Sequence, residues 1–130
     1  MDTKLVKMAI KARDVAYAPY SGVKVGAALL ADDGTVYTGC NIENASFGAT
    51  VCAERVALFK AISEGKRGFS AIAIAGGRES VGNTPPCGIC RQVLAEHCNP
   101  SLKVLIACDG EGAYAKTTLA ELLPNSFDLK

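Results

Sequence analysis

Apolar residues recur every three or four positions in several stretches of the chain, the spacing of helices with one buried face. Four segments have this pattern: 2–16, 52–63, 87–97 and a short last one, 117–123. Asp2 stands where an N-cap is needed and Gly65 where a C-cap is needed. Pro19 and Pro124 end the first and last helices, because proline cannot continue a helical hydrogen-bond ladder.

Short apolar runs between turn residues predict strands. Four runs qualify: 25–30, 36–39, 71–75 and 102–108. The first two are joined through Asp32-Asp33-Gly34, which is typical of a hairpin turn. Strands that alternate with helices imply an α/β protein with a mixed sheet covered on both faces.

Composition narrows the class of protein. The chain has 130 residues, 49% of them hydrophobic and 21% charged, which fits one folded domain over residues 1–130 and excludes disorder. A formal charge of +1 argues against partners held by charge, whether nucleic acid or an anionic membrane. No apolar stretch approaches the roughly 18 residues of a membrane span. Charged residues interrupt the first 20 positions, so no secretory signal is expected and the predicted location is cytoplasmic.

Six cysteines are many for so short a chain. In a small secreted protein they would suggest three disulfides, but a cytoplasmic protein keeps its thiols reduced. Each thiol therefore needs its own explanation. We expect Cys40, Cys98 and Cys108 to be small buried packing residues.

Cys87 and Cys90 form a C-x-x-C motif at the start of a predicted helix. Residues three apart share a helix face, so both sulfurs can reach one ion. By itself the motif fits a redox pair, half of a structural zinc site, or no site at all. Cys52 supplies a possible third sulfur, and three ligands with an open fourth position are the arrangement of a catalytic zinc site.

Glu54 follows Cys52 by two residues, which places their side chains roughly 200° apart around a helix. The two side chains can converge only on a target beyond the helix N-terminus, where free backbone N–H groups also point. A metal there, with Glu54 reaching a water beside it, satisfies this geometry. The alternative is a structural cysteine followed by a glutamate that the helix dipole favours.

Together these motifs resemble those of the zinc cytidine deaminase family, in which a zinc ion activates water and a glutamate transfers protons. The resemblance rests on C-A-E at 52–54 and P-C-G-I-C-R-Q at 86–92, and it extends over almost the whole chain. Further segments resemble the small homotetrameric cytidine deaminases: A-P-Y-S at 18–21, V-G-A-A at 25–28, G-C-N-I-E-N-A at 39–45 and E-L-L-P at 121–124.

The resemblance implies a fold, a cofactor and an activity. The fold is a three-layer α/β/α sandwich around a mixed sheet of about five strands. One Zn²⁺ per subunit is held by Cys52, Cys87 and Cys90, and Glu54 moves protons. The reaction is hydrolytic deamination of cytidine and 2′-deoxycytidine to uridine and 2′-deoxyuridine, with release of ammonia, in pyrimidine salvage. The expected assembly is a homotetramer with active sites near the subunit interfaces.

Three thiolates and one Zn²⁺ leave a net negative charge, which opposes the activation of water. We therefore hypothesise that Arg55, and with it Arg91, hydrogen-bonds the sulfurs and restores the Lewis acidity of the metal. Each arginine adjoins a ligand in the sequence. The alternative for both is an ordinary surface arginine.

Asn41 and Glu43 lie two residues apart at a predicted strand end, so their side chains share one face. An amide beside a carboxylate can bind sugar hydroxyls, because a hydroxyl both donates and accepts hydrogen bonds. In the resembling family this pair binds the 3′-hydroxyl of the nucleoside sugar. Without the resemblance, turn chemistry after a strand is the better explanation of the pair, and the resemblance reverses this preference. Ala53, within the C-A-E motif, is a further expected substrate contact.

Three apolar positions are expected near the substrate by resemblance. Val23 stands where relatives commonly carry an aromatic residue, so ring stacking is lost there. Phe47 stands where relatives often have tyrosine, so a hydroxyl is missing. Phe127 matches a phenylalanine that approaches a neighbouring subunit's site, although a hydrophobic contact of the C-terminus is an alternative.

Three other functions compete with this interpretation. The first is deamination of another aminopyrimidine nucleoside, such as an antibiotic like blasticidin S, which the intact Asn41 and Glu43 argue against. The second is a polynucleotide-editing deaminase, which the near-neutral charge opposes. The third is a non-catalytic module stabilised by zinc, which would have no use for Glu54.

Overall fold

The computed structural model describes residues 1–129, which form one five-stranded sheet with helices on both sides. The strands are β1 (Lys24–Ala31), β2 (Val36–Cys40), β3 (Phe69–Gly77), β4 (Lys103–Ala107) and β5 (Tyr114–Thr118). Their order across the sheet is β2-β1-β3-β4-β5. Only β3 and β4 run parallel, and every other neighbouring pair is antiparallel. The predicted mixed sheet is confirmed.

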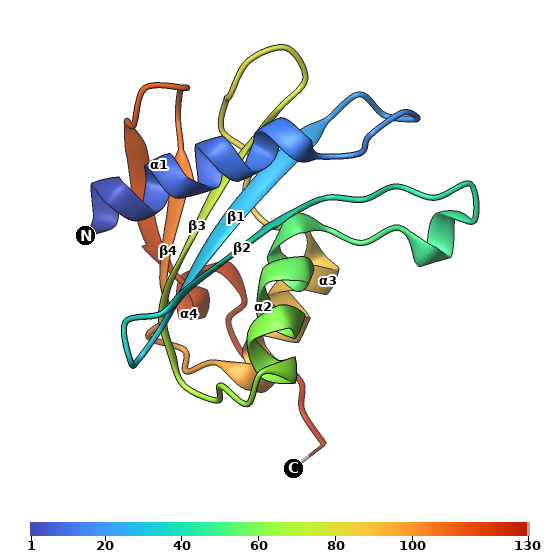
Figure 1. Cartoon of the computed structure of the whole chain (residues 1–130). Coiled ribbons are helices and arrows are strands. Elements are labelled where there is room, and N and C mark those ends of the chain that lie inside the picture. Colours follow the sequence, from blue (N-terminus) through green and yellow to red (C-terminus); the bar gives the residue numbers. More distant parts are fainter. Residues whose placement is uncertain (130) are drawn as a thin grey trace.

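The helices lie in two layers (Figure 1). They are α1 (Asp2–Ala12), α2 (Ala53–Ser63), α3 (Gly88–His97) and the short α4 (Leu119–Leu122), with 3₁₀ turns η1 (Arg13–Val15) and η2 (Phe47–Ala49). Figure 1 shows α1 across one face of the sheet, with α2 and α3 on the opposite face. Within residues 1–129, no helix is long and apolar enough to cross a membrane.

Two hydrophobic clusters hold these layers together. On one face, Leu5 and Val6 of α1 pack against small strand residues. On the other, Leu58 of α2 and Leu94 of α3 pack against the opposite side of the same strands, including Ile72. Because the central strand β3 is buried on both faces, its sequence is a nearly continuous apolar run. The three-layer α/β/α prediction is confirmed.

The backbone of α2 lies very close to β2, and glycine makes this possible. A Cβ atom added to Gly39 would lie 2.6 Å from the Ala53 carbonyl oxygen and 2.6 Å from the Ala57 nitrogen. Any larger residue would push the helix away from the strand. This contact brings the N-terminus of α2 beside the C-terminal end of β2, where Asn41 follows.

Several predicted boundaries differ from the structure. Met1 is the N-cap of α1, and α1 ends at Ala12 before the 3₁₀ turn η1. None of the four apolar runs predicted β5, because no residue of this strand at the sheet edge is fully buried. The C-cap of α2 is Glu64, one residue before the predicted Gly65. Gly65 follows it with a φ of 93°, and the Lys66 N–H bonds the Ala61 carbonyl at 3.0 Å, so glycine ends the helix as a C′ residue.

Candidate active site

Three cysteine sulfurs meet where two helices begin. Cys52 is the N-cap of α2, Cys87 is the N-cap of α3, and Cys90 lies in the first turn of α3. Their Sγ atoms all lie within 4.8 Å of one another, and Cys52 Sγ is 3.7 Å from Cys87 Sγ. Tetrahedral zinc with Zn–S bonds of about 2.3 Å needs sulfurs about 3.8 Å apart. The donor set therefore fits one zinc ion with a fourth position open.

All six cysteines are free thiols, as the sequence predicted. The other three have no common site. Cys40 and Cys98 are half-buried, but Cys108 is exposed. The expectation that all three are buried packing residues is therefore wrong for Cys108, which follows the last residue of β4 at the sheet end.

The surroundings of Cys52 stabilise its thiolate. A hydrogen bond from Cys90, together with one from Arg55, lowers the pKa of Cys52 to about 5, although burial opposes the charge. The Arg55 Nη2 lies 3.5 Å from Cys52 Sγ. The Arg55 Nε is buried, and no residue among 1–129 accepts its hydrogen. Arg55 thus lies where the charge hypothesis requires it.

Arg91 is arranged differently from Arg55. Its Nε donates to the Pro86 carbonyl at 2.8 Å, and its Nη1 donates to the Leu122 carbonyl at 2.9 Å. In the described structure its hydrogen bonds go to backbone oxygens and not to a ligand sulfur. Arg91 therefore anchors the segment before Cys87 to α4, because a guanidinium can hold two carbonyls at once.

Glu54 lies in the first turn of α2 and is only 4% exposed. Burial raises the pKa of Glu54 to about 7, and the nearby Cys52 thiolate acts in the same direction. A carboxyl group in this range can both accept and donate a proton at neutral pH, which is the property of a general acid–base catalyst.

A cavity of about 210 Å³ opens in front of the cysteines. Its wall contains the predicted ligands Cys52 and Cys87, the predicted catalytic Glu54, and the predicted sugar contacts Asn41 and Glu43. It is lined in full by Ser21, Val23, Val25, Asn41, Glu43, Thr50, Val51, Cys52, Glu54, Thr84, Pro85 and Cys87. Residues from four separate parts of the sequence thus meet around one hollow.

Asn41 and Glu43 are held by the loop before β1 and by the first residues of β1. The Asn41 side chain accepts from the Val25 N–H and donates to the Val23 carbonyl, each at 2.8 Å. The Glu43 carboxylate accepts from Ser21 and from the Tyr20 N–H, and these bonds lower the pKa of Glu43. Glu43 is therefore ionised and acts purely as a hydrogen-bond acceptor at neutral pH.

Three of the predicted substrate contacts are not in this cavity. The Ala53 side chain is packed in the core. Phe47 is 76% exposed and faces Tyr20 in an edge-to-face pair, with ring centroids 6.0 Å apart. Phe127 is also exposed, and its carbonyl accepts a hydrogen bond from Gln92. Val23, in contrast, lines the cavity.

The aromatic pair lines a second hollow of about 370 Å³ beside the first. Ser21, Glu43 and Thr50 line both hollows, so the two are neighbours on the surface. Thr50 and Thr84 are cavity residues that sequence reasoning missed. Both lie in loops, and no pattern in the sequence marked them. Ser21 belongs to the A-P-Y-S segment, for which the resemblance implies no role.

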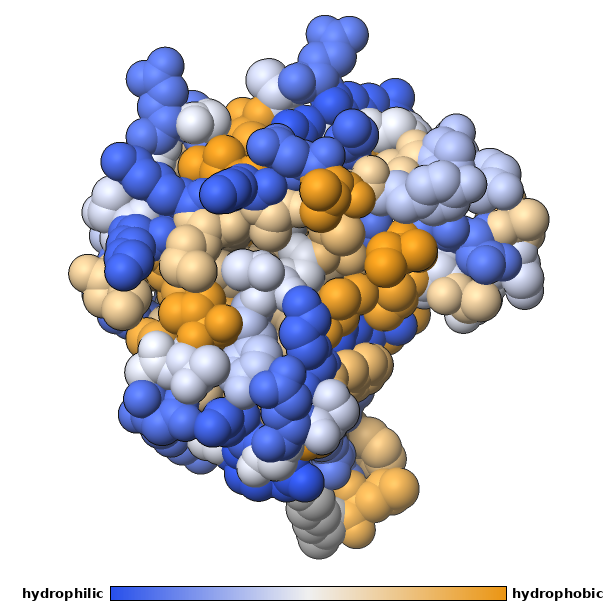
Figure 2. Space-filling view, in the orientation of Figure 1, coloured by the Kyte–Doolittle hydropathy of each residue, from blue (hydrophilic) through white to orange (hydrophobic). Residues whose placement is uncertain are grey.

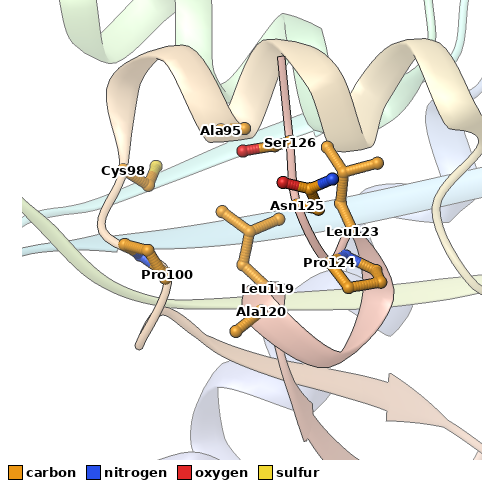
Figure 3. A pocket seen from close by; sticks show the side chains of 9 residues that line it. All are labelled: Ala95, Cys98, Pro100, Leu119, Ala120, Leu123, Pro124, Asn125 and Ser126. Atoms are coloured by element: carbon orange, nitrogen blue, oxygen red, sulfur yellow. The ribbon is translucent and has the colours of Figure 1, made fainter. Parts of the chain in front are cut away.

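A third cavity lies between α3, α4 and the chain that follows α4 (Figure 3). It has a volume of about 290 Å³ and includes Cys98, Leu119, Leu123 and Pro124 among its lining residues. Burial raises the pKa of the Cys98 thiol to about 12, so this cavity offers no group that exchanges protons at neutral pH. The candidate active site is therefore the cavity at Cys52.

The buried carboxyl group of Glu54, the cluster of three cysteine sulfurs and the order of the strands in the sheet are together those of a zinc deaminase. A family model for the cytidine and deoxycytidylate deaminase zinc-binding region matches residues 1–106. The chain belongs to this family, as the resemblance of its motifs predicted. Cytidine deaminase of Sporosarcina psychrophila is 52% identical over 124 residues, which cover 95% of this chain and 89% of that protein. Cytidine deaminase of Halalkalibacterium halodurans is 53% identical, with coverage of 95% and 91%.

Solved structures agree with this assignment. The crystal structure of cytidine deaminase from Burkholderia pseudomallei is 48% identical, with a TM-score of 0.87, and covers 95% of this chain and 97% of that one. The structure of cytidine deaminase from Mycobacterium tuberculosis is 40% identical, with a TM-score of 0.83 and coverage of 99% of both chains. The cytidine deaminase-like fold class is thereby confirmed.

Proposed function

We propose that this chain is a zinc-dependent hydrolase that deaminates cytidine and 2′-deoxycytidine to the corresponding uridines and ammonia. The observation that carries the proposal is the position of Glu54. It is a buried carboxyl group with a pKa near neutrality, in the same cavity as Cys52 and Cys87 of the sulfur cluster. The names of the similar proteins support the same substrate.

Cys52, Cys87 and Cys90 hold the zinc ion in this proposal. When bound, zinc supplies Lewis acidity that makes water nucleophilic near neutral pH. Glu54 takes a proton from the attacking water and delivers it to N3 of the pyrimidine. The water oxygen adds at C4 of the base as a hydroxyl group. Glu54 then takes the remaining proton of this hydroxyl and passes it to the amino group, so that the C4–N bond breaks, ammonia leaves and C4 becomes a carbonyl. Arg55 offsets the negative charge of the thiolates.

Asn41 and Glu43 bind the sugar in this proposal. The second hydrogen of the Asn41 amide is available as a donor, and the ionised Glu43 accepts from a hydroxyl. Their place in the same cavity as Glu54 supports this role. Val23 and Val25 give the base an apolar wall in the same cavity.

We also propose a homotetramer whose active sites lie near subunit interfaces. Several large apolar side chains are exposed, among them Tyr20 at 56% and Phe47 at 76%, which line the hollow beside the cavity. Figure 2 shows hydrophobic patches reaching the surface between charged side chains. Clustered apolar surface of this kind is typical of protein interfaces. Six free thiols support the cytoplasm as the location.

The test is ammonia release by the purified protein from cytidine, 2′-deoxycytidine, cytosine, blasticidin S and a cytosine-containing oligonucleotide. We expect turnover of the two simple nucleosides. Turnover of the oligonucleotide or the antibiotic without the nucleosides would contradict the proposal. No turnover of any compound would favour a non-catalytic zinc module. Light scattering coupled to size exclusion gives the oligomeric state, with four chains expected.

A further inference from the structure

The loop before β1 donates three hydrogen bonds to the carboxylate of Glu43. The N–H groups of Tyr20 and Ser21 donate to Oε1 at 2.9 and 3.1 Å, and the Ser21 hydroxyl donates to Oε2. Ser21 thus bonds both oxygens of the same carboxylate. A carboxylate held at both oxygens cannot turn about its last bond without breaking a hydrogen bond.

The Ser21 hydroxyl is itself held in place. Its oxygen accepts from the Val23 N–H at 3.0 Å, so its hydrogen is directed to Glu43. The Val23 carbonyl in turn accepts from Asn41. A continuous series of hydrogen bonds therefore runs from Glu43 through Ser21 and Val23 to Asn41, and all four residues line the cavity.

The turn between Ser21 and Val23 depends on Gly22. Its φ of 75° is in the left-handed region, and its N–H bonds the Ala18 carbonyl at 3.0 Å. This conformation lets Ser21 Oγ reach the Val23 N–H while the Ser21 hydroxyl points to Glu43. The loop therefore places the Ser21 hydroxyl between Asn41 and Glu43, the two side chains proposed to bind the sugar.

We propose that Ser21 is a positioning residue: it fixes the Glu43 carboxylate in the orientation that accepts a hydroxyl of the nucleoside sugar. The inference rests on the proposed function, and deepens it. Glu43 is half-exposed and would sample several rotamers without these bonds. Ser21 therefore affects substrates through the sugar hydroxyl and not through the chemistry at the base.

The test compares Ser21→Ala with Ser21→Thr in the zinc-loaded protein. We expect Ser21→Ala to raise the KM for cytidine about tenfold, since a hydrogen bond to a charged group is lost. The kcat should stay within about twofold, because Glu54 is untouched. Ser21→Thr keeps the hydroxyl and should restore the KM to within about twofold. Ser70→Ala, an exposed serine on β3 away from the cavity, is the matched control and should change neither constant.

A substrate without the 2′- and 3′-hydroxyls of the sugar separates positioning from a general effect on the loop. The kcat/KM for 2′,3′-dideoxycytidine should differ less than about twofold between wild type and Ser21→Ala. An equal loss on cytidine and the dideoxy compound would overturn the inference, as would a Ser21→Thr variant as impaired as Ser21→Ala. Thermal melting and zinc content of each variant show whether it is folded. If wild type fails to deaminate cytidine at all, the proposed function is itself contradicted, and the inference falls with it.

Discussion

Replacing Arg55 with glutamine tests whether its positive charge supports the sulfur cluster. The guanidinium lies 3.5 Å from Cys52 Sγ, and its Nε is buried without an acceptor in the described part of the chain. Glutamine removes the charge and is too short to place a donor at the same point. We expect the zinc ion to be held more weakly as a result.

The size of the effect follows from the geometry. Unit charges 3.5 Å apart attract by about 5 kcal/mol at an effective dielectric constant of about 20, before the cost of desolvation. Net contributions of hydrogen bonds to charged groups are about 1.5–3 kcal/mol. We therefore expect the zinc affinity of Arg55→Gln to fall about 10- to 150-fold, at about 1.4 kcal/mol for each factor of ten.

The assay is competition for zinc with a chromophoric chelator, together with turnover of cytidine at saturating zinc. Arg67→Gln is the matched control, because it also removes one positive charge. Arg67 bonds the carbonyls of Ile62 and Lys66 at the far end of α2. If Arg55→Gln retains zinc and turns over cytidine as well as Arg67→Gln does, the charge hypothesis is refuted.

Two further predictions concern stability. A strong chelator should lower the Tm by roughly 10 °C or more, and added zinc should restore it. The reason is that a ligand at about a thousand times its Kd stabilises the folded state by about 4 kcal/mol. The measurement is differential scanning calorimetry, and an unchanged Tm would rule out a metal that stabilises the fold. Gly39→Ala should lower the free energy of unfolding by about 1–3 kcal/mol in urea titrations, because its Cβ would overlap α2. Gly110→Ala is the control, because nothing lies within 4 Å of a Cβ added at Gly110. If Gly39→Ala and Gly110→Ala had equal free energies of unfolding, the close packing of α2 on β2 would be contradicted.

The meeting of the three sulfurs could be predicted from the sequence, because ligand spacing and helix geometry restrict where they can lie. Cys87 and Cys90 share one turn, and Cys52 and Glu54 can converge only beyond a helix N-terminus. Both conditions are local. The elements β1, β3 and β4 were also predicted, since buried strands have continuous apolar sequences.

Long-range backbone partners could not be predicted. Nothing in the sequence showed that Asn41 would bond the backbone of Val23 and Val25, or that Arg91 would bond Leu122 instead of a sulfur. The edge strand β5 was missed for a different reason. None of its residues is fully buried, so it has no apolar pattern, and only pairing with β4 reveals it.

The proposed role of Glu54 is tested most directly by ammonia release from cytidine, measured for wild type and Glu54→Gln at equal zinc content. The substitution keeps the size of the side chain but removes the group that moves protons. We predict that Glu54→Gln folds, retains zinc and loses at least about 10²–10⁴ in kcat. Equal turnover by the two proteins would contradict the account, because the buried carboxyl group would then have no part in the reaction.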